Sequence, residues 1–188
     1  MARDLRSRAK TLQAGGDVQG ARAARDASLR HFEAGVGGVD FDRFLYPQSV
    51  LVDLGMMYYE RKRFDDAATA LGEATRAPPF HHRDQKKEGL AFEVLGLMKM
   101  QRRDPAGALG FFNNAITVAP GQTSVHVHRA KCLVMLQDAL EKQGHLKVAR
   151  QLHAEALKSL RSVTPDAPGY PEARRLLKII KPPAESRP

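Results

Sequence analysis

The chain has 188 residues, 43% hydrophobic and 6% aromatic, and this apolar fraction suffices for a folded core, which excludes a wholly disordered protein. A disulfide framework is excluded because the chain has a single cysteine, Cys132. The sequence also lacks a run of about 18 apolar residues, which would predict a membrane span. The net charge is +9, from 30 Lys and Arg against 21 Asp and Glu, which leaves open a nucleic-acid binder, a membrane-surface binder, or a basic protein of another kind.

The residue pattern predicts helices along almost the whole chain. In segments such as 51–60 and 90–101, apolar residues recur every three or four positions, whereas the alternating runs typical of strands are nearly absent. Pro and Gly separate segments of helical length, and Asp104-Pro105 is typical of a helix start, with the aspartate as its cap. Pro47 leaves open a later start, near residue 46, for the third helix. In chain order, the pattern predicts helices at 2–14, 17–34, 42–61, 64–77, 83–102, 105–118, 122–143, 145–162 and 172–180.

Two segments of the chain repeat one pattern without gaps. Each has a large residue, a Leu-Gly pair, a small residue twelve positions after the glycine, and then a large residue, an alanine and a proline. The residues are Leu51, Leu54, Gly55, Tyr58, Ala67, Leu71, Ala74 and Pro79 in the first segment, and Phe92, Leu95, Gly96, Lys99, Ala108, Phe112, Ala115 and Pro120 in the second. The pattern resembles the tetratricopeptide repeat (TPR) family, whose units are helix–turn–helix pairs of about 34 residues. Weaker copies lie at 133–161 and 5–21, and an ordinary helical bundle is the alternative.

The resemblance implies an all-α fold, an α-solenoid of about four antiparallel helix pairs over residues 1–162. A Pro-rich linker is expected at 163–171, an amphipathic C-terminal helix at 172–181 and a disordered tail at 182–188. Ala67, Ala108 and Ala149 are each 41 residues apart, seven more than the family's usual repeat. Seven residues are about two helical turns, so we expect the first helix of each pair to be lengthened.

The resemblance also implies a binding surface, because the first helix of each pair lines the concave face in this family. The residues mapped to that surface are Val52, Asp53, Met56, Tyr59, Glu60, Glu93, Val94, Leu97, Met100, Val134, Met135 and Asp138. Where some family members hold acidic tails with Lys, Asn or Arg, this chain has Val or Met, which offer apolar contacts instead. We therefore predict a non-enzymatic scaffold, adaptor or assembly factor. Its protein partner would offer a peptide or an amphipathic helix with apolar anchors and some basic residues.

The positive charge lies mainly at the two ends of the chain. Residues 1–30 carry a net +4 and residues 170–188 a net +3, whereas the long segment 31–169 carries only +2. The alternative function is therefore binding of RNA or an anionic surface through the basic ends. The edge of the turns, where Arg61-Lys62-Arg63 and Arg102-Arg103 lie, could contribute, although cations at helix C-termini also complement the helix dipole.

The C-terminal helix leaves two further questions open. Leu176, Leu177, Ile179 and Ile180 form an apolar side, with Arg and Lys around it. That side either caps the last helix pair or fills the concave groove. A basic amphipathic helix is also typical of a segment that binds a membrane surface or a partner, and of these readings we favour capping.

The sequence contains no recognisable catalytic motif, and we predict neither a cofactor nor a metal site. The pairs His81-His82 and His126/His128 have spacings that do not place both rings on one helix face. Cys132 lies in an apolar helical segment, which favours a buried thiol over a nucleophile. The first ten residues are charged, without an apolar leader, and together with the lone thiol they predict a cytoplasmic protein.

Overall fold

The computed structural model describes residues 2–36, 48–76 and 84–183. In these residues the chain forms helices and no strand. The helices are α1 (Ala2–Ala14), α2 (Val18–Val36), α3 (Gln48–Glu60), α4 (Phe64–Thr75), α5 (Gln85–Gln101), α6 (Pro105–Val118), α7 (Thr123–Lys142), α8 (Leu146–Arg161) and α9 (Tyr170–Ile179).

Each predicted helix corresponds to one of these elements, and most ends agree within a few residues. The helix at Pro105–Val118 has the predicted bounds, because the Asp104 carboxylate accepts a hydrogen bond from the Gly107 N–H (2.8 Å) and Pro105 opens the first turn. Segments 42–47 and 77–83 of the predicted helices, Pro47 included, lie outside the described residues.

The C-terminal region differs from the expectation in one respect. The predicted linker at 163–171 is a series of turns in which Val163 and Ala167 are buried, and α9 begins at Tyr170, two residues earlier than expected. The linker therefore packs on the last helix pair. Of the predicted tail, residues 184–188 lie outside the described residues, and Pro183 is buried.

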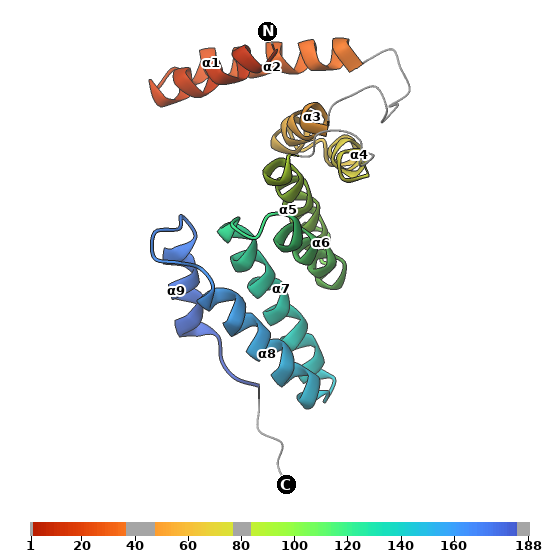
Figure 1. The fold of residues 1–188 in the computed structure, drawn as a ribbon, viewed down its shortest axis with the longest axis vertical. Helices are drawn as coiled ribbons and strands as arrows, with labels where there is room; N and C mark the ends of the chain where they lie inside the picture. The colour runs from red at the N-terminus through yellow and green to blue at the C-terminus, as the bar shows by residue number, and fades with distance from the viewer. Residues whose placement is uncertain (1, 37–47, 77–83, 184–188) are drawn as a thin grey trace.

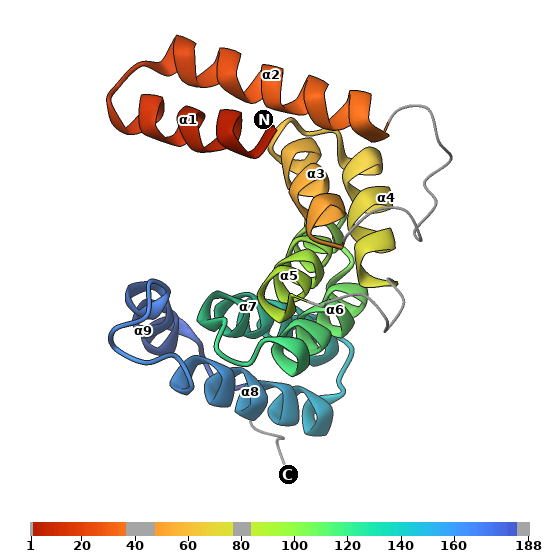
Figure 2. The same cartoon turned by 45° about the horizontal axis from the view of Figure 1, so that its top comes forward.

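The helices pack as successive pairs, α1–α2, α3–α4, α5–α6 and α7–α8, which follow one another along a curved array (Figure 1). In Figure 2 the array is shaped like a C, with α1–α2 and α9 at its two ends. The first helices α3, α5 and α7 lie toward the inner side of the curve. The chain is thus an α-solenoid with a C-terminal helix, as predicted. Within the described residues, no helix combines the length and the apolar character needed to cross a bilayer.

Close approach of the two helices explains the repeated Leu-Gly pair. A Cβ atom on Gly55 would lie 2.5 Å from Cγ of Leu71, and one on Gly96 would lie 2.5 Å from Cε1 of Phe112. Both of these large side chains are fully buried. The glycine of the first helix therefore makes the space that the large residue of the second helix fills.

The turns inside the pairs are also equivalent to one another. Gly16, Lys62, Arg103 and Gly144 each have a positive φ, between 58° and 83°, just after the first helix of their pair. A left-handed residue at this position closes the helix C-terminus and reverses the chain. The extra length of the repeat lies in the first helix, most clearly in α7, which is 20 residues long and includes 123–129.

Candidate partner-binding surface

Nine of the twelve residues that were mapped to a binding surface are accessible in the structure. They come from three successive first helices and keep part or most of their surface exposed: Asp53, Met56, Tyr59, Glu60, Leu97, Met100, Val134, Met135 and Asp138. The apolar members of this set are Met56 on α3, Leu97 and Met100 on α5, and Met135 on α7, and we refer to these four residues as the strip. Met56, Leu97 and Met100 also pack partly against the cores. Met135 is the most exposed of these four, at 43%.

The prediction was wrong for the other three mapped residues, which are buried. Val52 is 0% and Val94 is 3% exposed, and both belong to the core that joins α2, α3, α4 and α5. A mapped position specifies only a direction around its helix axis. At Val52 and Val94, the neighbouring helices pack against that side and bury the side chain. Glu93 is also buried, and its contacts explain why a carboxylate is tolerated there.

Glu93 joins α5 to the beginning of α7. Its carboxylate accepts a hydrogen bond from Gln122 Nε2 and contacts His128 Nδ1 at 2.9 Å. Burial raises the pKa of Glu93, but hydrogen bonds from His128, Ser124 and Gln122 outweigh it, so the pKa lies below its ordinary value of 4.5. Glu93 is therefore a structural carboxylate that connects two helix pairs.

Polar contacts also bridge α3 and α5 along the concave side. Lys87 Nζ lies 2.8 Å from the carboxylate of Asp53 and donates to the Ser49 carbonyl at 3.2 Å. Gln101 Nε2 donates to the Tyr59 hydroxyl at 3.1 Å. The charge of Asp53 is thus balanced within the chain.

Two other mapped carboxylates remain without a cation. Among the described residues, Glu60 on α3 and Asp138 on α7 are exposed and have no ion-pair partner. They lie on the first and last of the three strip-forming helices. Glu60, however, lines a hollow together with Arg22, Arg25 and Arg61, so Asp138 is the mapped carboxylate that offers a ligand its negative charge most directly.

Three of the five cations at the turn edge form ion pairs, whereas Lys62 and Arg103 form none among the described residues. Arg61 pairs with Asp26 at 2.7 Å, Arg63 with Glu33 at 2.7 Å, and Arg102 with Asp65 at 2.8 Å. These ion pairs connect each turn to a neighbouring helix. The arrangement favours their structural role over a phosphate-binding ridge.

The helix α9 packs on the last pair of the array. Ala173, Leu176, Leu177 and Ile180 join the core formed by residues of α7, α8 and the linker, such as Val127 and Leu160. Two polar contacts add to the packing. Lys131 Nζ lies 2.6 Å from the Glu172 carboxylate, and Gln137 Nε2 donates to the Lys181 carbonyl at 3.3 Å. These contacts support capping and leave the surfaces of α3 and α5 uncovered.

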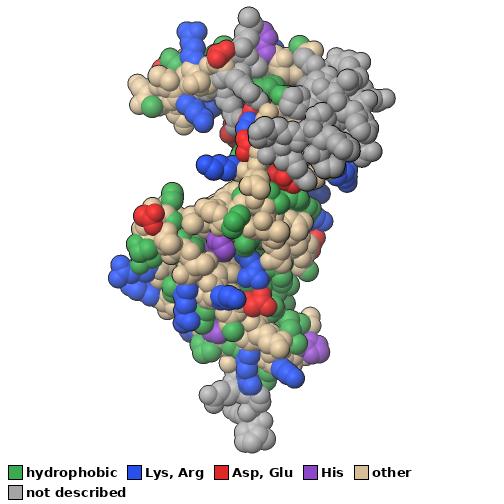
Figure 3. Space-filling model, viewed as in Figure 1, with side chains coloured by type: hydrophobic (Ala, Val, Ile, Leu, Met, Phe, Trp, Pro, Cys, Tyr) green, Lys and Arg blue, Asp and Glu red, His purple; other side chains and the backbone are tan. Residues whose placement is uncertain are grey.

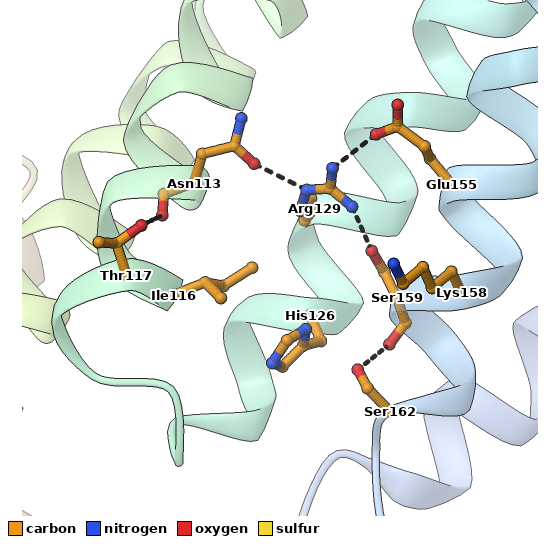
Figure 4. A pocket seen from close by; sticks show the side chains of 9 residues that line it. All are labelled: Asn113, Ile116, Thr117, His126, Arg129, Glu155, Lys158, Ser159 and Ser162. Atoms are coloured by element: carbon orange, nitrogen blue, oxygen red, sulfur yellow. Dashed lines mark hydrogen bonds and ion pairs between the residues drawn. The ribbon is translucent and has the colours of Figure 1, made fainter.

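A hollow of about 540 Å³ lies between α6, α7 and α8 (Figure 4). Arg129 at its centre donates to Asn113 Oδ1 at 2.8 Å and Ser159 Oγ at 2.6 Å, and it pairs with Glu155 at 2.6 Å. The guanidinium thereby joins three helices. Sequence reasoning did not single out Arg129, because its partners are 16 to 30 residues away and no local pattern relates them.

The histidines do not form a metal site in the part of the chain that the structure describes, where no group of three or more His, Cys, Asp or Glu is suitably placed. His126 faces the hollow around Arg129, and burial lowers its pKa. His128 contacts Glu93 on a different element. His81 and His82 lie outside the described residues.

The repeat is therefore present in three features: the Gly-to-large contact at Gly55 and Gly96, the left-handed turn residue, and the buried alanines Ala67, Ala108 and Ala149. The chain is an α-solenoid of repeated helix pairs and resembles the tetratricopeptide type in these features. No family model matches it.

Comparison with known proteins finds similarity to two named proteins. It is 31% identical over 104 residues to the type IV pilus assembly protein PilF of Pseudomonas aeruginosa, a match that covers 55% of this chain and 36% of PilF. The chain thus spans about a third of that relative. The solved structure of P. aeruginosa PilF superposes with a TM-score of 0.49 and 23% identity, over 85% of this chain and 64% of that one. The structure of YrrB, described as a TPR protein with an unusual peptide-binding site, gives a TM-score of 0.45 and 18% identity, over 90% of this chain and 70% of YrrB.

Proposed function

We propose that the chain is a non-enzymatic protein-interaction module that binds a segment of a partner protein along the concave side of α3, α5 and α7. The observation that carries the proposal is the apolar strip across three successive first helices. It is formed by Met56, Leu97, Met100 and Met135 and is left uncovered by α9. Unbranched methionine side chains adapt to different apolar anchors at low cost.

The charges beside the strip indicate the chemistry of the ligand. Asp53 is balanced by Lys87 and Glu60 shares a hollow with arginines, so Asp138 remains to attract a cation most directly. We expect a peptide or an amphipathic helix with apolar anchors and a Lys or Arg next to them. The similarity to a pilus assembly protein supports a role as a scaffold, adaptor or assembly factor. The predicted cytoplasmic location stays a prediction.

The proposal is tested by selecting peptides from a random display library on the full chain. The selected sequences should combine apolar residues with Lys or Arg. The substitution Met135→Glu, which places a charge on the strip, should weaken the selected peptides at least tenfold, or about 1.4 kcal/mol.

The matched control is Val148→Glu on α8. Val148 is 44% exposed, against 43% for Met135, but it lies outside the strip. Peptide affinity should be unchanged in this variant, as measured by fluorescence anisotropy. Equal loss in both variants, or equal retention, would place the binding site elsewhere on the molecule.

A further inference from the structure

The helix α9 presents a basic side directly away from the body of the array. Its docked residues, Ala173, Leu176, Leu177 and Ile180, occupy one side of the helix. Arg174 and Lys178 are four residues apart, so they lie on one stripe of the opposite side. Arg175 lies beside this stripe, and Lys181 follows the helix in the same direction.

None of these four cations forms an ion pair or a side-chain hydrogen bond in the described structure, and all four are exposed. Arg175 interacts with Glu172 only through longer-range electrostatics. The sole carboxylate of α9, Glu172, is bound to Lys131 of α7 at 2.6 Å. This ion pair leaves the outward side of the helix without negative charge. The helix α9 is therefore oriented so that its apolar side is buried, Glu172 pairs with α7, and the basic residues face solvent.

The neighbouring helix extends the positive charge. Arg161, at the end of α8, is exposed and forms no ion pair among the described residues, whereas Lys158 lines the hollow around Arg129. Figure 3 shows Lys and Arg side chains over the α8 and α9 end of the molecule, with few Asp and Glu side chains among them. The positive charge is thus spread over a face and does not converge on a pocket.

An apolar side chain lies within this basic face. Ile179 is 57% exposed and directly follows Lys178, on the edge between the docked and the basic sides of α9. Spread cations with an apolar side chain among them suit the boundary between lipid headgroups and acyl chains. A nucleic-acid backbone would pair with the cations but leave Ile179 in water.

We infer that the outward side of α9 adsorbs to an anionic phospholipid surface while the helix remains docked on α7 and α8. The apolar side of α9 is occupied by that docking, so binding is peripheral and reversible. Each cation close to an anionic surface contributes about fivefold to partitioning. This surface is separate from the concave strip, and both can act in one molecule.

The experiment measures co-sedimentation of the full chain with vesicles of phosphatidylcholine containing 30% phosphatidylglycerol. Binding is expected with these vesicles and not with pure phosphatidylcholine, and it should fall as NaCl rises from 50 to 300 mM. The double substitution Arg174→Gln/Lys178→Gln should weaken it about twenty-five-fold, the product of two fivefold contributions. Circular dichroism verifies that the variant remains folded.

The matched control is Arg8→Gln/Lys10→Gln, which removes two exposed cations of α1 and changes the net charge equally. Its binding to vesicles should stay within a factor of two. Equal loss in the two double variants would show that only net charge matters and would overturn the inference. So would a lack of binding to the anionic vesicles, or tighter binding to poly-uridine RNA that is lost in the α9 variant. Met135→Glu should leave vesicle binding unchanged, so failure of the peptide experiment and failure of this one are distinguishable.

Discussion

Replacing Gly96 with alanine is expected to destabilise the chain, although alanine is the better helix former. Gly96 lies inside α5, where an added Cβ would be 2.5 Å from Cε1, 2.8 Å from Cδ1 and 3.0 Å from Cζ of Phe112. Carbon atoms that are not bonded prefer separations of about 3.5–4.0 Å. One methyl group therefore requires a shift of about 1 Å by the ring or by the helix.

The magnitude follows from two opposing contributions. Forcing an extra methyl group into a packed core typically costs about 1–3 kcal/mol, and the Phe112 ring is fully buried, so it has no free space to move into. Alanine in a helix interior regains about 1 kcal/mol relative to glycine. The expected net loss in the free energy of unfolding is up to about 2 kcal/mol.

The control is the same substitution at Gly110 in α6, where no heavy atom lies within 4 Å of the added Cβ. Gly110→Ala should stabilise the chain by about 0.5–1 kcal/mol, because only the helix preference changes. Denaturation in urea, followed by far-ultraviolet circular dichroism, gives both values. If Gly96→Ala proves as stabilising as Gly110→Ala, close helix approach is not the reason for the Leu-Gly pair, and the reasoning is refuted.

Three further results are expected from the side-chain network. Glu93→Gln should lower stability by about 1–3 kcal/mol at pH 7. Since the folded pKa of Glu93 is lowered, its contribution to stability is complete above the ordinary value of 4.5 and is lost as pH falls from there through the folded value. In urea melts, the difference in stability between the two proteins should therefore be smaller at pH 3 than at pH 7. Burial raises the pKa of Cys132 to about 11, so Ellman's reagent at pH 8 should react about a hundredfold more slowly with the native chain than with the guanidinium-unfolded one, and equal rates would contradict the burial. Arg129→Met should lower the free energy of unfolding by about 1–2 kcal/mol. The control is Arg161→Met: Arg161 is exposed and forms no ion pair among the described residues, so this substitution should change the free energy of unfolding by less than about 0.5 kcal/mol in the same assay.

Much of the fold could be predicted because its signals are local. The Asp104-Pro105 start and the apolar periodicity depend on residues within one or two turns of each other. The repeat adds a longer-range signal, since Gly55 and Gly96 occupy equivalent positions in two copies. The 41-residue spacing also indicated where the additional length lies, and α7 shows it in the first helix.

The binding surface was predicted less well, because a position on a helix indicates a side but not how deeply a neighbour covers it. Val52 and Val94 lie on the mapped side, yet adjacent helices bury them. Glu93 was read as a surface carboxylate because its partners Gln122 and His128 are 29 and 35 residues away. Their approach depends on how α5 and α7 stack.

The sequence by itself determined the helices, their pairing and the solenoid, because periodicity, turn residues and a repeated glycine act over short distances along the chain. Only the tertiary structure decided which side chains remain accessible and which charges remain unbalanced. It paired Asp53 with Lys87 and Glu172 with Lys131, while leaving Met135 and the bases of α9 exposed. The physical reason is that burial and ion pairing depend on contacts between helices that are far apart in the sequence, and such contacts exist only once the pairs have stacked.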